Sequence, residues 1–269
     1  MSERDGYEHG VPCWIDTSQP DATTAAAFYE RLLGWETELT TRDAAGPRYA
    51  MCRLRGRDVA AIGEGGSIVP PGPAAWTTYV QVVDVEETVA KAQAAGGTVV
   101  AAPADSLDGG RIALLADPAG AAFGVWEQSG HRGAQLVNEP GAWTMSVLLC
   151  DEPEREKPFY AAAFGWTADP FPLGDAEGAL FRLDGYVGGE PGQPVPRDVI
   201  AVMAPAFGRP AGWTVSFWVD DADAVAARAP ELGGTVLAGP FDNAISREAV
   251  IADPAGAVFS VSTAPTAGH

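Results

Sequence analysis

Two carboxylates, Asp58 and Glu64, are the side chains of this sequence that we predict could move a proton for a substrate. A carboxyl group acts as a general acid or base when its surroundings bring its pKa close to the working pH. The chain has three histidines, which lie near its two ends and in a polar segment in the middle: His9, His269 and His131. No Ser-His-Asp set can be argued from these positions, so acid–base chemistry would fall to Asp58 or Glu64.

Eight tryptophans offer a second kind of chemistry, which is stacking on a flat or hydrophobic ligand. Four stand near the starts of predicted strands, at similar places along the chain: Trp14, Trp76, Trp143 and Trp213. We predict that these four line a ligand site, together with Trp126, Trp218 and Glu64. The alternative is that the four anchor a core, and the pattern leaves both interpretations open. Only one of Phe217 and Trp218 can face a ligand, since neighbouring strand residues point to opposite sides.

The chain contains an internal repeat. The segment AWTTYVQVVDVEETVAKAQAAGGTVVAAP, from Ala75, aligns without a gap with GWTVSFWVDDADAVAARAPELGGTVLAGP, from Gly212. The tetrapeptide DPAG occurs at Asp117 and again at Asp253, and FYERLLGW matches FYAAAFGW further upstream. A repeat of this extent indicates two similar halves of about 130 residues each.

Each half reads as two copies of a unit made of a strand, a helix and further strands. Residues 11–17 favour a strand, Asp21 is placed to cap a helix, and Gly34 is placed to end it. Residues 48–54 and 58–62 then favour a hairpin. The same plan returns three more times along the chain.

The predicted units, which we call modules, cover residues 9–66, 74–128, 142–205 and 211–263. We therefore expect an α+β fold with a first domain at 1–130, a linker at 131–141 and a second domain at 142–269. The Gly, Asn and Pro content of the linker is typical of an exposed segment. Each half is expected to have its own core.

These landmarks resemble the vicinal oxygen chelate superfamily, which includes glyoxalase I, bleomycin-resistance proteins and extradiol dioxygenases. The resemblance rests on the helix ending FYERLLGW, the later helix ending AAGGTVV and the closing DPAG hairpin, and it covers nearly the whole chain. With its two halves, the chain resembles the two-domain actinobacterial members. It implies four βαβββ modules that form two tandem glyoxalase-like domains. Each domain would be a cup-shaped mixed sheet with helices outside.

The metal enzymes of this superfamily place His, Glu or Gln on the first and last strands of each module. Seven residues after Asp117 and Asp253, where glyoxalase-like relatives have a ligating glutamate, this chain has Gly124 and Ser260. Its first strands present tryptophan and threonine, and a single acid such as Asp58 rarely holds a transition metal without imidazole. We therefore expect no metal and no other cofactor.

The acidic composition argues against some partners. With 36 acidic and 17 basic residues, the net charge of -19 would repel a nucleic acid backbone. The apolar runs are shorter than the roughly 18 to 20 residues that span a bilayer, and the first ten residues lack the apolar core of a signal peptide. We expect a cytoplasmic protein without nucleic-acid or membrane partners, either a monomer built as an internal pseudo-dimer or a homodimer.

Two functions follow from these residues. The first is metal-independent binding of an aromatic or hydrophobic ligand, which can be cationic, in tryptophan-lined cups, such as antibiotic sequestration or self-resistance in secondary metabolism. The alternative is a metal-free biosynthetic enzyme of the cyclase, isomerase or lyase type, with Glu64 or Asp58 as its acid or base. The second half has Ala204 near the place equivalent to Glu64, so catalysis could belong to one cup only.

Overall fold

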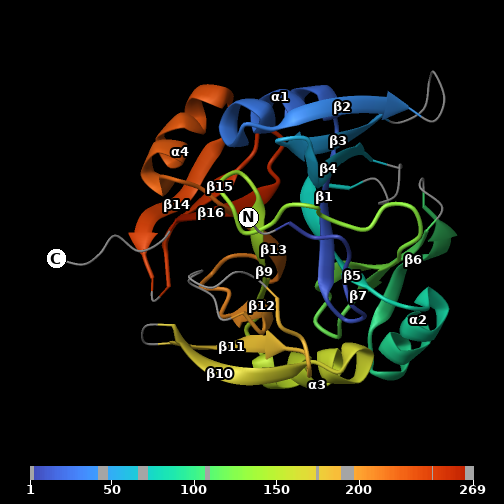
Figure 1. Ribbon diagram of the computed structural model, residues 1–269. Helices are drawn as coiled ribbons and strands as arrows, with labels where there is room; N and C mark the ends of the chain where they lie inside the picture. Colours follow the sequence, from blue (N-terminus) through green and yellow to red (C-terminus); the bar gives the residue numbers. More distant parts are fainter. Residues whose placement is uncertain are drawn as a thin grey trace.

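The computed structural model describes residues 3–41, 48–65, 72–106, 110–173, 176–188, 197–243 and 245–263. Its strands form two eight-stranded sheets, one in each half of the chain, and the helices pack outside them (Figure 1). This arrangement confirms the predicted α+β fold.

The first sheet holds two βαβββ modules side by side. Its elements are β1 (Pro12–Gln19), α1 (Ala22–Leu33), β2 (Glu36–Thr41), β3 (Arg48–Leu54), β4 (Arg57–Glu64), β5 (Ala75–Gln81), α2 (Val85–Ala94), β6 (Thr98–Asp105), β7 (Arg111–Ala116) and β8 (Ala122–Glu127). The strand order is β2-β3-β4-β1-β5-β8-β7-β6. The first strands of the two modules pair antiparallel at the centre, and each pairs in parallel with the last strand of its own module.

The second sheet repeats this plan. Its elements are β9 (Trp143–Leu149), α3 (Pro153–Phe164), β10 (Thr167–Leu173), β11 (Ala176–Arg182), β12 (Val199–Ala204), β13 (Gly212–Trp218), α4 (Ala222–Arg228), the 3-10 turn η1 (Pro230–Leu232), β14 (Thr235–Asp242), β15 (Arg247–Ala252) and β16 (Val258–Thr263). The strand order is β10-β11-β12-β9-β13-β16-β15-β14. Each sheet is therefore built from the strands of one half only, and in the described residues no strand of one half pairs with a strand of the other.

The helices begin and end where the sequence predicts. Asp21 precedes α1 and accepts a hydrogen bond from the backbone N–H of Thr23 at 3.1 Å, which satisfies one of the open donors of the first turn. Gly34 ends the helix with a φ of 77°, a left-handed conformation that glycine adopts without steric cost. Gly165 ends α3 in the same way, so the repeated Gly-Trp pairs are helix stops.

The repeated DPAG segments are turns that also connect the two halves. Oδ1 of Asp117 accepts the backbone N–H groups of Ala119 and Ala121, and Asp253 forms the matching pair of bonds. Oδ2 of each aspartate accepts a tyrosine hydroxyl from the opposite half. Tyr160 lies 2.8 Å from Asp117, and Tyr29 lies 3.0 Å from Asp253.

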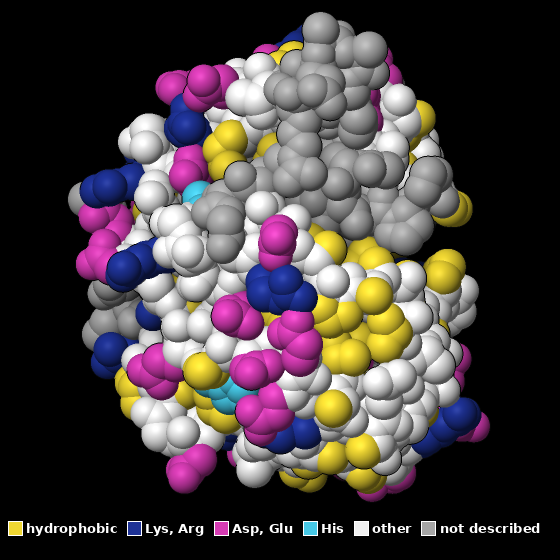
Figure 2. Space-filling view, turned by 90° about the vertical axis from the view of Figure 1, so that its right-hand side faces the viewer, with side chains coloured by type: hydrophobic (Ala, Val, Ile, Leu, Met, Phe, Trp, Pro, Cys, Tyr) yellow, Lys and Arg dark blue, Asp and Glu magenta, His cyan; other side chains and the backbone are white. Residues whose placement is uncertain are grey.

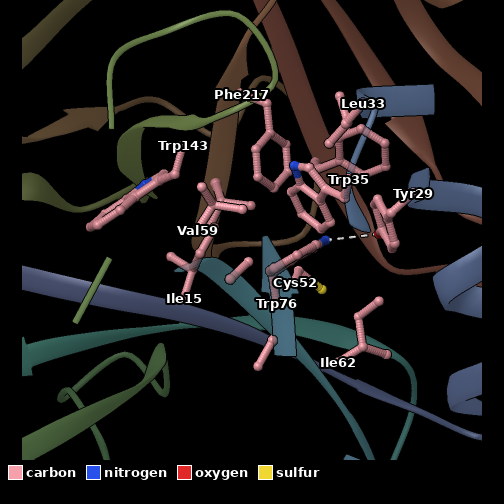
Figure 3. Close-up of a cluster of buried hydrophobic side chains, with 14 of the residues drawn as sticks. Ile15, Tyr29, Leu33, Trp35, Cys52, Val59, Ile62, Trp76, Trp143 and Phe217 are labelled. Carbon is pink, nitrogen blue, oxygen red and sulfur yellow. Dashed lines mark hydrogen bonds between the residues drawn. The ribbon is translucent and has the colours of Figure 1, made fainter. Parts of the chain in front are cut away.

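The expectation that each half has its own core is wrong. One core joins mainly the first module to the fourth, with Trp76 contributed by the second, and its rings include Tyr29, Trp35, Trp76 and Phe217 (Figure 3). The other core joins the second module to the third. The reason is that α1 lies beside α4 and α3 lies beside α2, so each convex sheet face is covered partly by the other half (Figure 1).

The linker between the halves is packed, contrary to the exposed segment that its composition predicts. Ala134 and Leu136 are buried, and the Ala134 N–H donates to the Cys13 carbonyl at 2.8 Å. The Gln135 N–H donates to the Asp58 carbonyl at 2.7 Å. These bonds tie the linker to the first half, while the predicted domain limits at 130 and 142 stay predictions.

Charged side chains of both signs are interspersed on the face that carries α2 and β6 (Figure 2). In the part of the chain that the structure describes, no helix is long and apolar enough to cross a membrane.

Candidate ligand-binding site

A cavity of about 690 Å³ occupies the concave face of the second sheet, which we call the second cup. Alternate residues of the central strands line it: Met145, Val147 and Leu149 of β9, Val202 and Ala204 of β12, Thr214, Ser216 and Trp218 of β13, Glu248 and Val250 of β15, and Ser260 and Ser262 of β16. The intervening residues Val215 and Phe217 point the other way, into a core. The equivalent face of the first sheet is the first cup.

Small hydroxyl side chains form part of the second cup. The hydroxyls of Ser216 and Ser262 lie 3.1 Å apart, and Ser260 donates to Oε1 of Glu248 at 2.7 Å. The side-chain amide of Asn243 donates to the other oxygen of Glu248 at 2.9 Å. The cup therefore combines a largely apolar wall with the Glu248 carboxylate, which two donors hold in place, and Asp242 and Arg209 also line it.

Aromatic side chains stand around the opening of the second cup. Trp218 lines the wall at the end of β13, and Phe207 and Phe241 lie at the rim with 63% and 40% of their surfaces exposed. Phe207 has a φ of 52°, a left-handed conformation that costs a non-glycine residue about 1 to 2 kcal/mol. An exposed, strained aromatic at the mouth of a cavity is a feature of a binding site.

Larger side chains occupy the first cup. Asp16 pairs with Thr77 as Val147 pairs with Thr214, so the ladder makes Asp16 the counterpart of Val147 and Tyr79 the counterpart of Ser216. The Tyr79 ring lies against Gly124, where a β-carbon would overlap it. This contact explains why glycine follows Asp117 by seven residues, whereas its counterpart Ser260 faces open space.

Trp14 and Trp126, two of the predicted ligand residues, lie together in the first cup. Their ring centroids are 6.3 Å apart. The imidazole of His131 stacks on Trp126 at 5.4 Å and meets Trp14 edge-on at 4.7 Å. Both tryptophans are buried under this linker histidine, which the sequence pattern had placed in solvent.

Trp76, Trp143 and Trp213 do not face either cup, contrary to their predicted role. The indole N–H of Trp76 donates to the Tyr29 hydroxyl at 3.1 Å, and that of Trp213 donates to Tyr160 at 2.9 Å. Trp143 packs into the same core as Trp76, beside Ile15 and Val59 (Figure 3). Strand alternation turns these three side chains toward the convex side, where the two halves meet.

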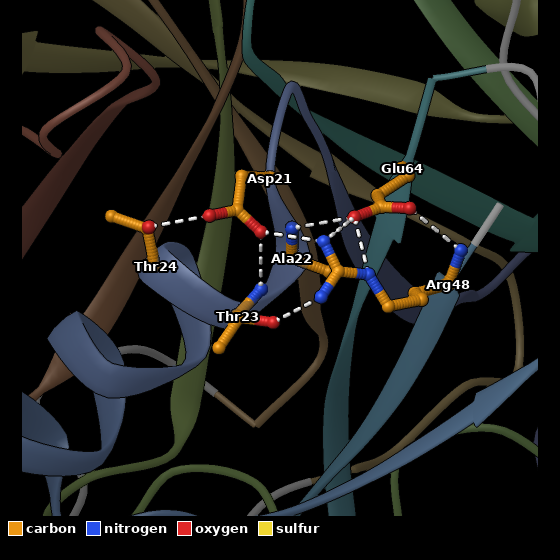
Figure 4. A network of polar contacts seen from close by, with 6 residues as sticks. All are labelled: Asp21, Ala22, Thr23, Thr24, Arg48 and Glu64. Carbon is orange, nitrogen blue, oxygen red and sulfur yellow. Dashed lines mark hydrogen bonds and ion pairs between the residues drawn. The ribbon is translucent and has the colours of Figure 1, made fainter.

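Glu64 is bound up in a network at the start of α1, outside the first cup (Figure 4). Its Oε1 accepts the Ala22 N–H at 3.3 Å and the Arg48 Nε at 2.8 Å, and its Oε2 accepts the Arg48 backbone N–H at 2.8 Å. Burial opposes ionisation of Glu64, but Arg48 and the helix N–H outweigh it and lower the pKa of the carboxyl. The geometry makes Glu64 a helix cap rather than the predicted ligand contact.

Asp58 also has structural partners. It lies 2.9 Å from Arg53 Nε and 3.3 Å from His131 Nε2, and these contacts, that of His131 foremost, lower the pKa of Asp58 against the opposing effect of burial. It lines a separate, charged pocket of about 460 Å³ with Arg57 and Arg132. An acid stabilised as its anion in this way is a poor general acid or base near neutral pH.

Comparison with known proteins identifies the family. Residues 14–126 and 132–262 each match the glyoxalase-like domain. The chain belongs to the glyoxalase-like domain family. It is 39% identical over 271 residues to CFP32 of Mycobacterium tuberculosis, which carries a provisional glyoxylase name, with 97% of each chain covered.

Two further relatives come from Streptomyces. The chain is 35% identical to the anthracycline biosynthesis protein DauV of Streptomyces sp. strain C5, and 34% identical to the anthracycline biosynthesis protein DnrV of Streptomyces peucetius. In both comparisons 95% of this chain and 94% of the relative are covered. Relatives named for secondary metabolism therefore match nearly the whole chain.

Solved structures share the fold. A Mn(II)-bound glyoxalase from Novosphingobium aromaticivorans matches with a TM-score of 0.63 and 18% identity over 95% of this chain and 82% of that one. The 2,3-dioxygenase LapB from Pseudomonas sp. KL28 matches with a TM-score of 0.62 and 17% identity over 98% and 96%. The predicted resemblance to the vicinal oxygen chelate superfamily is confirmed.

The side chains of the cups do not fit a divalent metal. The concave positions of the central strands carry aliphatic, thioether and hydroxyl groups in the second cup, where Glu248 is a carboxylate without an imidazole partner. The first cup offers Asp16 beside a phenol. Within the described ranges, no group of three or more His, Cys, Asp or Glu is arranged to hold a metal, whereas transition metals in proteins rely on imidazole, thiolate and carboxylate sets.

Proposed function

We propose that this protein binds a flat, largely hydrophobic small molecule in the second cup, without a metal, as part of secondary metabolism. The 690 Å³ cavity carries the proposal. Its volume lies within the range of about 300 to 1,000 Å³ that holds drug-sized ligands. Its wall is mainly apolar, with a few hydroxyls, the carboxylates of Glu248 and Asp242, and Arg209 to orient the ligand.

Trp218, Phe207 and Phe241 supply the aromatic surface for such a ligand. Stacking on these rings accounts for affinity toward a planar ring system, and Glu248 adds attraction when the ligand carries a positive charge. Phe207 keeps its ring exposed despite the cost of its backbone conformation, which supports a role in contact with a ligand.

The names of DauV and DnrV favour an aromatic polycyclic ligand of the anthracycline kind. Binding alone would serve sequestration or self-resistance, because a bound antibiotic is withheld from its target. The enzyme alternative that relies on Glu64 or Asp58 receives no support from the geometry, since Arg48 holds the Glu64 carboxylate, and Arg53 and His131 hold that of Asp58.

Titration with an anthracycline aglycone, followed by tryptophan fluorescence and calorimetry, tests the proposal. Trp218→Ala is expected to weaken binding by about 1 to 3 kcal/mol, the usual effect of removing an aromatic anchor. Trp218→Phe is the matched control, because it keeps a ring for stacking and removes one source of fluorescence.

A second variant closes the cup by copying the first half. Ser216→Tyr combined with Ser260→Gly reproduces the arrangement of Tyr79 against Gly124. This variant should fold and lose binding at the second cup. Undiminished affinity in both the Trp218→Ala and the double variant would disprove the proposed site.

A further inference from the structure

Arg209 supplies the second cup with a positive charge to which the proposed function assigns no partner. Its side chain lines the cavity, is partly buried, and forms no ion pair with any acid in the described part of the chain. Arg182 and Arg247, by contrast, each pair with two aspartates. A guanidinium has five N–H donors and stays charged at every physiological pH, so one that lines a cavity without an acceptor is suited to bind an anionic ligand.

A tight turn presents Arg209 beside Phe207. The Arg209 N–H donates to the Ala206 carbonyl at 2.9 Å, and the two residues between them, Phe207 and Gly208, have φ values of 52° and 79°. Positive φ at both central positions is the pattern of a type I′ turn, in which Gly, Asn and Asp are preferred. Phenylalanine is an unfavourable choice there, and its presence at a cavity mouth indicates a contact that offsets the strain. The turn thus offers a ring and a guanidinium together.

The second cup has a positive end and an acidic end. The turn joins β12 to β13, so Arg209 lies near the start of β13. Trp218 is the last residue of β13 and pairs with Ser262, which pairs in turn with Glu248. Since a strand rises about 3.3 Å per residue, the seven residues of β13 separate the two ends by roughly 20 Å. Arg209 and Glu248 therefore mark opposite ends of one cavity.

We propose that the second cup selects an aromatic molecule that carries a carboxylate, which Arg209 binds through two parallel N–H bonds while Phe207 covers the adjoining ring. This inference rests on the proposed function of the second cup and names the class of its ligand. Bidentate pairing of guanidinium with carboxylate is among the strong, directional interactions of proteins. The carboxylate then lies at the start of β13, and any hydrogen-bond donors of the ligand face Glu248 at the other end.

A carboxylate suits the Arg209 end of the cup better than a neutral group does. A neutral ring that covers the guanidinium removes water from it and supplies no acceptor, which costs free energy. The net charge of -19 repels anions at long range, but salt screens exposed charges beyond about 8 Å at physiological ionic strength. At the acidic end, Asp242 is already paired with Arg247 at 3.2 Å. Arg209 therefore dominates the charge at its own end.

Two probes of matched size, anthraquinone-2-carboxylate and anthraquinone-2-carboxamide, test this inference by calorimetry on the whole chain. The unaltered protein should bind the carboxylate about tenfold or more tightly, because hydrogen bonds between two charged groups are stronger than those to a neutral amide. Arg209→Gln should abolish or reverse that preference, since the acids of the cup then act unopposed. Arg209→Lys should keep part of it, because the ammonium group retains the charge without the planar fork.

Arg228→Gln is the matched control. Arg228 is an exposed residue of α4, so the substitution removes the same charge from the second half at a position outside the cavity lining. It should leave the preference for the carboxylate unchanged. Thermal melts check folding, and Arg209→Gln should melt with the parent, because its side chain has no ion pair to lose within the described residues.

The outcomes separate the role of Arg209 from the existence of the ligand site. A preference that survives Arg209→Gln, or that Arg228→Gln removes to the same extent, would overturn the role of Arg209. Equal affinity for the two probes, with both weakened by Trp218→Ala, would also overturn it and leave the proposed ligand site in the second cup intact. If neither probe binds the unaltered protein, both proposals fail.

Discussion

The paired contacts between Tyr29 and Asp253, and between Tyr160 and Asp117, should hold the two halves in one cooperative unit. Each tyrosine hydroxyl donates to an aspartate of the opposite half and accepts an indole N–H, from Trp76 or Trp213. Tyr29→Phe removes this hydroxyl and keeps the ring. The perturbation therefore isolates the polar part of the junction.

The cost can be estimated from the two bonds. A hydrogen bond to a charged group contributes about 1.5 to 3 kcal/mol, and a buried donor left without an acceptor costs about 1 to 3 kcal/mol. Gln19 still donates to Oδ2 of Asp253 at 2.6 Å, so that aspartate stays partly satisfied in the variant. We expect a net loss of about 3 kcal/mol, which for a chain of this size lowers Tm by about 6 to 12 °C.

Urea unfolding monitored by tryptophan fluorescence and circular dichroism measures this loss. Both signals should fall in one transition, since each core contains residues of both halves. Tyr7→Phe is the control, because its hydroxyl donates only to the Ala134 carbonyl and its loss should cost about 1 kcal/mol. The reasoning is refuted if Tyr29→Phe costs no more than Tyr7→Phe, or if the halves unfold in separate steps.

Three other measurements test the structure. Burial, with help from the charge of Asp117, raises the pKa of Glu156 to about 7, so the folded state holds a proton that the unfolded state releases. Stability should therefore fall between about pH 4.5 and pH 7, and Glu156→Gln should flatten that decline in pH-dependent melts; an unchanged slope would contradict it. Limited proteolysis should spare residues 131–141, because the linker backbone is bonded to the first half, and early cleavage there would show that it is exposed. Elemental analysis should find no stoichiometric Zn, Fe, Mn or Ni, and one tightly bound metal per half would disprove the expectation drawn from the donor set.

Much of the fold could be predicted because its signals are local. Asp21 and Gly34 mark the ends of α1 through backbone bonds within one turn of the helix, and the second half repeats the glycine stop. The repeat then multiplies a single module by four. The sharing of cores between halves had no such signal, because it depends on which sheet face a distant helix covers.

The orientation of the tryptophans was harder to predict because it depends on strand register. Trp14 and Trp143 stand at similar places in their halves, but the strand pairing matches Trp14 with Met145 and matches Trp143 with Pro12. In both sheets the register shifts by one residue between these two positions, so the two tryptophans lie on opposite sides of the shift. A shift of one residue reverses the face of every side chain that follows. Trp14 is thereby placed in a cup and Trp143 in a core.

Glu64 and Asp58 show a different limit of sequence analysis. Asp58 lies near the start of β4 and Glu64 at its end, where a metal ligand or a proton-transfer residue could stand. The partner of Glu64 is Arg48, on the neighbouring strand β3, and a partner of Asp58 is His131, in the linker. Asp16, which lies in a cup, stood in an apolar run and gave no signal of its own. Only the pairing of β1 with β5 brings it to Tyr79.

The location of the cores explains how two similar halves can have such different cups. The convex faces carry the junction, where Tyr29, Trp76 and their counterparts in the other half leave little room for change. On the concave faces, Tyr79 contacts Gly124 and Ser260 bonds to Glu248 within their own sheets, so these positions can change without breaking the bonds between the two halves. Tyr79 with Gly124, against Ser216 with Ser260, is one such pair: the large ring requires the glycine, and the two serines leave the space open. A duplicated chain of this design can keep one binding cavity open while the other cup acquires a buried acid.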